Sequence, residues 1–179
     1  NDWGAFATYS IGFGASDRLA VTGEFRERRY PSGPLRSRTR DIAELTALWT
    51  HSLANGKTSL SLGGSFAEEW ATQERIDGDA SIWSIRSSLD HAFSDSLDAF
   101  FFLEYWEEGY DEERPDFSTD PNLLVQRSDD LVYAGGGLIW SFAPGWALRP
   151  AFEYDWENSN VPALAYSKID VWVTVRKSF

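Results

Sequence analysis

Hydrophobic and polar residues alternate with a period of two along almost the whole chain, and helical periodicity is hard to find. Residues 97–105 are an example, because Leu97 and Phe101 share one face of a strand whereas Asp98 and Glu104 lie on the other. The alternation predicts nine strand-like segments, at residues 3–15, 18–30, 38–53, 57–71, 80–93, 97–108, 130–142, 146–157 and 167–179.

The connections between these segments alternate between short and long. The short ones read SD, ANG, SDS and APG, and the longer ones read PSGPLRS, QERIDGD, a long acidic segment and NSNVPALA. The segments run to about ten residues or more, enough to cross a hydrocarbon layer at a tilt, whereas most strands have about five or six. Long strands joined in strict hairpins indicate an all-β fold, an antiparallel up-and-down barrel with about nine to ten strands visible.

Charged residues gather on the polar face of most strands, and this decides which way the barrel faces. A soluble lipocalin-like barrel has an apolar interior and a polar exterior. Here we expect the opposite, a wet polar interior and an apolar face in lipid, as in a transmembrane β-barrel. The mixed signs leave two interpretations open, a conducting lumen or charges that pair and plug a narrow barrel. The predicted lumen-facing charges are Glu24, Arg26, Arg40, Glu44, Arg86, Glu104, Arg149, Glu153, Lys168, Asp170 and Arg176.

Aromatic residues make up 16% of the chain, with 9 Trp, 7 Tyr and 12 Phe. Amphipathic rings settle at headgroup depth on both sides of a bilayer, so rings near strand ends predict two interfacial girdles. The predicted girdle residues are Trp49, Trp70, Tyr105, Trp140, Trp146, Tyr154 and Trp156.

The chain closes with IDVWVTVRKSF, in which alternate valines lead to an aromatic residue: Val171, Val173, Val175 and Phe179. This ending resembles the C-terminal signature of bacterial outer-membrane barrels, in which the assembly machinery reads the last strand and its terminal aromatic before the barrel closes. The resemblance implies a Gram-negative outer-membrane protein with one barrel domain over residues 1–179. It also implies contacts with membrane lipid, lipopolysaccharide and the barrel assembly machinery.

A narrower resemblance covers the last forty or so residues. The final hairpin is similar to that of surface lipoprotein assembly modifier barrels and of other barrels that follow periplasmic tetratricopeptide repeats. The residues that carry it are Phe152, Tyr154, Ser159, Asn160, Tyr166, Val171 and Phe179. The resemblance implies a transport or export barrel, with other barrel or periplasmic subunits as partners, although the chain shows no helical repeats and no comparable match before Gly145.

Strand parity adds an expectation about the architecture. If Phe179 ends at the periplasmic side, the short turns are periplasmic and the first of nine strands starts outside the cell. Single-chain bacterial barrels normally have an even strand number with both termini in the periplasm. Either the strand count is one short, or the chain is the C-terminal portion of a larger barrel.

Charge and residue types narrow the function. A net charge of −12 disfavours a nucleic-acid partner, because phosphate binding needs clustered Lys and Arg. Only His51 and His91 are available as neutral-pH bases, and both lie where strands enter the short turns. We therefore expect no enzyme and no cofactor.

Two local features have alternative interpretations. The acidic segment from Gly109 to Asp130 could bind Ca²⁺ or divalent-loaded lipopolysaccharide, but its spacing matches no ligand loop, so a solvated acidic loop without a metal is expected. The triplet Gly135–Gly137 is expected to mark a bend or close packing, in a segment that is hydrophobic in both registers.

Together these patterns predict an outer-membrane β-barrel for passage or export of a solute, a polysaccharide or a (lipo)protein. The alternative is a non-conducting scaffold or adhesion barrel in an outer-membrane complex.

Overall fold

The computed structural model describes residues 2–29, 39–53, 56–72, 75–116 and 120–178. Within these ranges the chain forms nine long strands, as predicted, and one short 3-10 helix. The described part holds no helix with the length and apolar character needed to cross a membrane. The elements are β1 (Asp2–Phe13), β2 (Asp17–Arg28), β3 (Arg40–Leu53), β4 (Thr58–Ala71), β5 (Ala80–Ser94), β6 (Leu97–Asp116), β7 (Asp120–Ala143), β8 (Trp146–Ser159), η3 (Pro162–Leu164) and β9 (Tyr166–Lys177).

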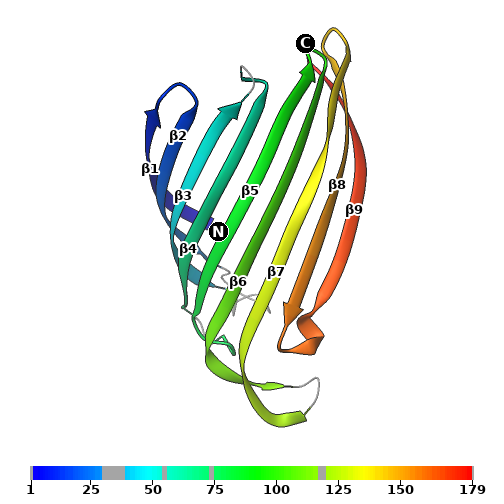
Figure 1. The fold of residues 1–179 in the computed structure, drawn as a ribbon. Helices are drawn as coiled ribbons and strands as arrows, with labels where there is room; N and C mark the ends of the chain where they lie inside the picture. The colour runs from blue at the N-terminus through cyan, green and yellow to red at the C-terminus, as the bar shows by residue number, and fades with distance from the viewer. Residues whose placement is uncertain (1, 30–38, 54–55, 73–74, 117–119, 179) are drawn as a thin grey trace.

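Each strand pairs antiparallel with the next one along the chain, in one sheet with the order β1 to β9 (Figure 1). The register keeps the alternation in phase across neighbours: Phe101 lies opposite Gly136, Gly136 opposite Phe152, and Phe152 opposite Val171. Since side chains on one strand point to alternate faces, residues opposite one another share a face. The predicted all-β, antiparallel up-and-down fold is therefore confirmed.

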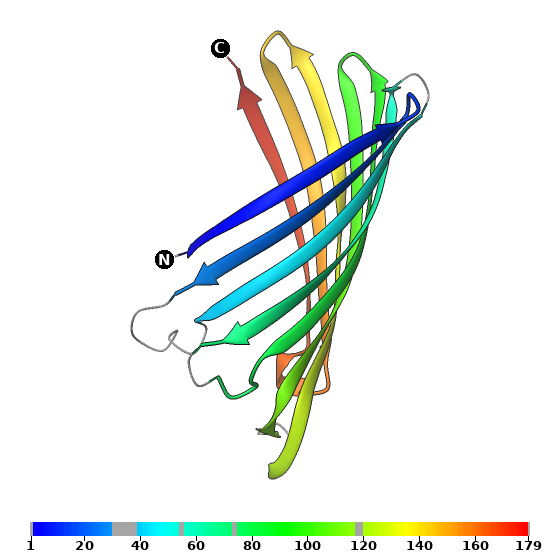
Figure 2. The same ribbon diagram turned by 90° about the vertical axis from the view of Figure 1, so that its left-hand side faces the viewer.

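The sheet is strongly curved and its strands are tilted. Seen from the side, β5 to β7 form the convex back, and the two edge strands β1 and β9 extend toward the same side (Figure 2). Among the described residues, strand pairing does not join β1 to β9, so the sheet is an open trough with a convex and a concave face.

The short-turn end of the sheet is tied together by a repeated backbone hydrogen bond. In each case a carbonyl oxygen in a short turn accepts a hydrogen bond from a backbone amide near the end of the strand that follows that hairpin; the β1–β2 turn, for example, accepts from the end of β3. Gly145, with a φ of 74°, allows the last of these contacts, because a Cβ there would lie 2.5 Å from the carbonyl oxygen of Ser178. The four bonds are Ser52 N to Ser16 O (2.8 Å), Ala92 N to Lys57 O (2.7 Å), Ser141 N to Ser96 O (2.8 Å) and Ser178 N to Gly145 O (2.7 Å).

The predicted long acidic loop is wrong for most of its length. Strands β6 and β7 continue their ladder beyond the other hairpins, with Glu113 opposite Gln126 and Arg114 opposite Val125. Acidic composition predicts a loop, but a charged ladder persists where the side chains reach water and the backbone stays paired. The register shifts between Gly109 and Glu113, and residues 117–119 lie outside the described residues.

Candidate functional site on the concave face

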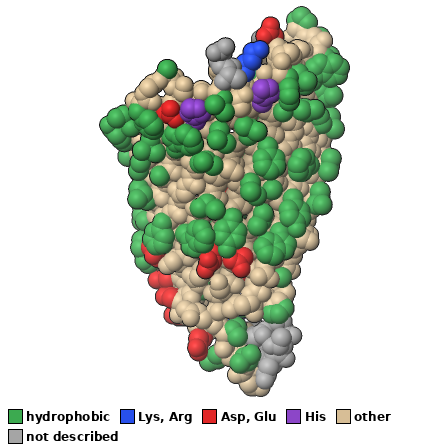
Figure 3. Space-filling model, viewed as in Figure 1, with side chains coloured by type: hydrophobic (Ala, Val, Ile, Leu, Met, Phe, Trp, Pro, Cys, Tyr) green, Lys and Arg blue, Asp and Glu red, His purple; other side chains and the backbone are tan. Residues whose placement is uncertain are grey.

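The two faces of the sheet differ in chemistry along every strand. The convex face carries exposed hydrophobic side chains that form a broad band over the molecule (Figure 3). Acidic side chains border this band toward the long-loop end, and both histidines border it toward the short-turn end (Figure 3). The register resolves the ambiguous segment in β7, since Val132, Leu138 and Trp140 fall on the convex face. A band of this kind is what a lipid-facing barrel surface shows.

The predicted lumen-facing charges all fall on the opposite, concave face. The register shows this directly, because Arg86 lies opposite Glu104 and Glu153 opposite Asp170. The same face carries hydroxyl residues on the first strands. The full set on the concave face is Glu24, Arg26, Arg40, Glu44, Arg86, Glu104, Arg149, Glu153, Lys168, Asp170 and Arg176.

The predicted girdle residues all fall on the convex face, in two groups at its borders. Trp49, Trp140 and Trp146 lie toward the short turns, whereas Trp70, Tyr105, Tyr154 and Trp156 lie toward the long loops. Two of them, Trp49 and Tyr105, and also Trp83 donate hydrogen bonds to carboxylates at the borders of the band. The three bonds are Trp49 Nε1 to Asp17 (2.9 Å), Trp83 Nε1 to Glu107 (3.1 Å) and Tyr105 Oη to Asp130 (2.6 Å). Trp83, which was not predicted as a girdle residue, thus shares this arrangement.

Three of the four residues of the predicted C-terminal signal are described. Val171, Val173 and Val175 project from the convex face of β9 and are 75%, 61% and 58% exposed. Phe179 lies outside the described residues. The alternation of the last strand is therefore present, and its recognition by assembly machinery stays a prediction.

At the long-loop end, beyond the convex apolar band, Arg127 is the centre of a buried ion-pair network. Its guanidinium contacts Asp77 at 3.1 Å, Asp129, and Glu157 at 3.7 Å. It also lies over the ring of Tyr110, 4.5 Å from the centroid. Asp129 is only 1% exposed, so this network is shielded from water. Buried charges persist only when they are paired, which explains why the carboxylates surround the guanidinium.

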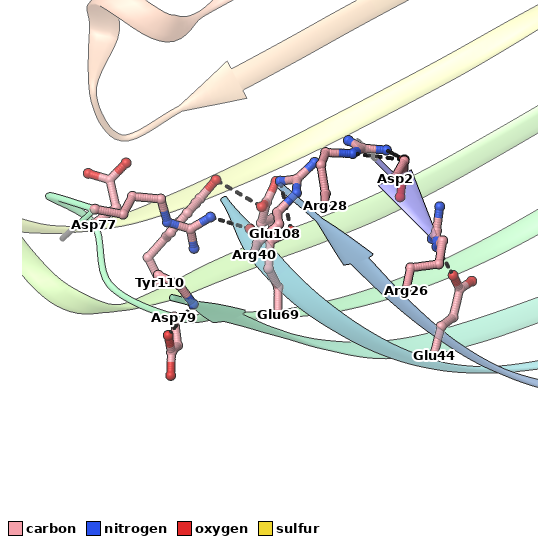
Figure 4. A network of polar contacts seen from close by, with 12 residues as sticks. Asp2, Arg26, Arg28, Arg40, Glu44, Glu69, Asp77, Asp79, Glu108 and Tyr110 are labelled. Atoms are coloured by element: carbon pink, nitrogen blue, oxygen red, sulfur yellow. Dashed lines mark hydrogen bonds and ion pairs between the residues drawn. The ribbon is translucent and has the colours of Figure 1, made fainter. Parts of the chain in front are cut away.

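Glu69 is a second centre at the same end, and it is also 1% exposed. Arg40 reaches it from β3 at 2.7 Å, and Arg75 pairs with it from the segment between β4 and β5. Arg75 also lies over the ring of Tyr110 and donates to the carbonyl oxygen of Gly78 at 2.7 Å. Figure 4 shows this cluster between the ends of the strands. Arg75 links the β4–β5 connection to β6 through the Tyr110 ring, and Arg127 links it to β7 through Asp77.

The network continues toward β1 with more exposed pairs. Arg26 contacts Glu24 at 2.9 Å and Glu44 at 3.2 Å, and Arg28 contacts Asp2 at 3.2 Å (Figure 4). These side chains are about a quarter to a half exposed, and exposed ion pairs contribute little to stability. The well-shielded centres at Glu69 and Arg127 matter more.

Two titratable groups of this network lie past the apolar band, since Glu107 already marks its border. Burial raises the pKa of the Glu108 carboxyl, although the Tyr110 hydroxyl donates to it at 2.8 Å and opposes the shift. Burial also raises the pKa of Tyr110, and the charge of Glu108 adds to this. Tyr110 therefore stays a neutral hydrogen-bond donor.

Closer to the middle of the concave face, aromatic rings of β6 lie against glycines of β7. A Cβ at Gly135 would lie 2.5 Å from Cζ of Phe102, and one at Gly137 would lie 3.0 Å from Cε1 of Phe100. The guanidinium of Arg149 covers Phe100 at 4.5 Å from the ring centroid. The glycine triplet thus marks close packing, which was one of the two expected roles.

The acidic segment makes structural contacts where its side chains are described. Asp111 accepts a hydrogen bond from the backbone amide of Asp79 at 2.7 Å. In the described part of the chain, no three His, Cys, Asp or Glu side chains are grouped so that they could hold a metal ion.

The two histidines lie on the convex face, at its short-turn border. His51 Nδ1 is 2.8 Å from Asp17, and the His51 ring stacks on Trp49. His91 Nδ1 is 2.7 Å from the Thr58 hydroxyl. Neither histidine shares a face with the charges of the concave side, so they do not assemble a catalytic group with them.

Sequence reasoning missed the shielded network around Arg127 and Glu69. Asp77 and Arg127 are 50 residues apart, and both belong to segments that the sequence pattern assigned to loops. A recurrence of Arg and Asp or Glu near the ends of successive predicted strands was the available signal. It does not tell which residues pair.

Comparison with known proteins finds a solved structure with a similar fold and no match by sequence. No family model and no curated protein matches the chain. Among solved structures, the chain is similar to the outer membrane channel DcaP of Acinetobacter baumannii, with a TM-score of 0.66 and 18% identity. The similarity covers 94% of this chain and 50% of that channel, so the chain spans half the length of the structure it matches. Over these residues the two proteins therefore share a fold, a curved antiparallel up-and-down sheet.

Proposed function

We propose that the chain forms part of the wall of an outer-membrane channel through which hydrophilic solutes pass. The observation that carries the proposal is the separation of chemistry across the sheet. All nine strands present an apolar face on the convex side, and most present charged or hydroxyl residues on the concave side. A barrel with an apolar outer face and a polar inner face has lipid outside and water inside. The similarity to the DcaP channel over 94% of the chain supports the same function.

In this proposal the short turns face the periplasm and the long loops face the cell exterior, as is usual for bacterial barrels. The aromatic girdles then contact lipid headgroups, and the exterior border contacts lipopolysaccharide. The alternating valines of β9 serve as the signal for the barrel assembly machinery. Export of a polysaccharide or a (lipo)protein, as in the assembly-modifier barrels, is a finer version of this function that rests on the C-terminal resemblance alone.

A non-conducting scaffold is the second candidate, and the ion-pair network favours it. The pairs around Arg127 and Glu69 fix the β4–β5 connection against β6 and β7 at the mouth. A mouth fixed in this way offers a rigid platform for a partner, which is the role of a scaffold. The two functions differ in whether the concave face encloses a continuous water path.

Planar-bilayer recording of the full-length protein separates these functions. Heat-modifiable migration on a detergent gel first establishes that the protein is folded. We expect steady single-channel steps that scale with salt concentration. A folded protein that inserts and gives no steps would contradict the channel and favour the scaffold.

A further inference from the structure

A hollow at mid-height on the concave face has the features of a solute-binding site. It has a volume of about 360 Å³, and its lining includes Leu48, Ser61, Arg86, Ser88, Phe102 and Glu104. On the convex side, Leu62 and Leu103 lie at the same level within the apolar band. The hollow is therefore on the channel wall within the membrane, away from the ion-pair network of the mouth. Its volume is in the range of small-molecule sites.

Aromatic rings form the apolar part of this hollow. The Phe102 ring lies over Gly135, and the Tyr133 ring packs beside it with centroids 4.9 Å apart. Because Gly135 has no side chain, the Phe102 ring can pack directly against the backbone of β7. The two adjacent rings are inclined by 39° and form a shallow aromatic angle on the wall, and the ring faces carry partial negative charge.

The polar part of the hollow is balanced in charge. Arg86 and Glu104 are opposite one another on β5 and β6, and both line the hollow. Among the described residues, the structure records no ion pair within 4 Å for either side chain. Ser61 and Ser88 also line the hollow, and their hydroxyls add further donors and acceptors to those of Arg86 and Glu104.

This combination discriminates among solute classes. An anion is attracted by Arg86 but repelled by Glu104, and a cation the reverse, so neither gains a net electrostatic attraction from the pair. A purely apolar solute would desolvate both charges without giving them partners, which is costly. A neutral solute with many hydroxyls and one apolar face satisfies donors, acceptors and rings together.

We propose that this hollow binds a carbohydrate ring, with the C–H face of the sugar on Phe102 and Tyr133 and its hydroxyls on Arg86 and Glu104. The proposal rests on the channel function and names a neutral sugar as a class of solute that the channel takes. Each hydroxyl can both donate and accept, so one sugar can serve both charged groups at once.

Sugar block of the single-channel current tests this site. Maltotriose is added to the full-length protein in a planar bilayer, and sorbitol serves as a hydroxyl-rich solute without a ring. We expect a saturable reduction of current by maltotriose and a much weaker effect of sorbitol. Phe102→Leu and Glu104→Gln should each weaken the apparent affinity about tenfold, which corresponds to about 1.4 kcal/mol. Phe101→Leu, on the convex face of the same strand, is the matched control and should leave the block unchanged.

The outcomes separate this inference from the proposed function. Steady conductance that maltotriose does not affect, or a block that both variants leave intact, overturns the sugar site and leaves the channel standing. If the folded protein gives no conductance, the channel proposal fails. Calorimetric titration of the detergent-solubilised protein with maltotriose then decides the site independently, and an absence of binding overturns it.

Discussion

Arg127 is the side chain whose removal should cost the barrel most at its long-loop end. Arg127→Met keeps an unbranched side chain of similar length and removes the charge. Asp129, 1% exposed, then loses the one ion-pair partner recorded for it among the described residues, while Asp77 keeps Arg114 at 3.1 Å. Leaving a buried charge without its partner costs about 3–5 kcal/mol. We therefore expect the free energy of unfolding to fall by about that amount.

The measurement is urea unfolding of the full-length protein in phospholipid vesicles, followed by tryptophan fluorescence. Arg86→Met is the matched control, since Arg86 is also on the concave face but forms no ion pair with any residue that the structure describes, and it should lose less than about 1 kcal/mol. Adding Asp129→Asn to Arg127→Met should recover most of the stability, because it removes the stranded charge. Equal losses in the two single variants, or no recovery in the double variant, would refute the reasoning.

Three further changes probe the pH response, the packing and the two faces. The pKa of Glu108 is raised in the folded state, so the stability that its protonated form contributes is fully present below the unfolded pKa and is lost as pH rises through the folded pKa. Glu108→Gln should therefore raise the free energy of unfolding at pH 7.5 and not at pH 4. An equal effect at both pH values would contradict this. Gly137→Ala places a Cβ 2.4 Å from the Pro150 carbonyl oxygen and should cost about 1–3 kcal/mol in urea unfolding, whereas Gly23→Ala, with no atom within 4 Å, should be tolerated. Val173→Arg should destabilise the folded protein in vesicles by about 2–4 kcal/mol, and Thr174→Arg, on the concave face, should not; a reversed order would mean that the faces are assigned wrongly.

The alternation of residues was enough to predict the strands and to sort side chains onto the two faces. Glu153 and Asp170, or Tyr154 and Ile169, are on the same face because the period of a strand is two and the register is in phase. The predicted split between charges and girdle aromatics follows from this geometry alone. Whether the concave face holds water stays a prediction.

The contacts within each face could not be predicted from alternation. Arg127 could have paired with any carboxylate at the long-loop end, and only the three-dimensional arrangement brings Asp77 to it across 50 residues. The acidic composition beyond Gly109 predicts a loop, because composition does not reveal the backbone pairing of β6 with β7 there. The packing of Phe102 on Gly135 depends on the register between β6 and β7, which short-range patterns do not fix.

The repeated hydrogen bonds at the short-turn end make the two ends of the trough mechanically unequal. Each turn there is completed by an amide of the following hairpin, so no hairpin can tilt or slide without breaking a bond in its neighbour. At the opposite end the strands differ in length, up to 20 residues in β6 and 24 in β7, and side-chain ion pairs take the place of the backbone stitching. We therefore expect the short-turn end to hold the curvature of the trough more firmly than the long-loop end, where side-chain ion pairs can exchange partners without breaking backbone hydrogen bonds.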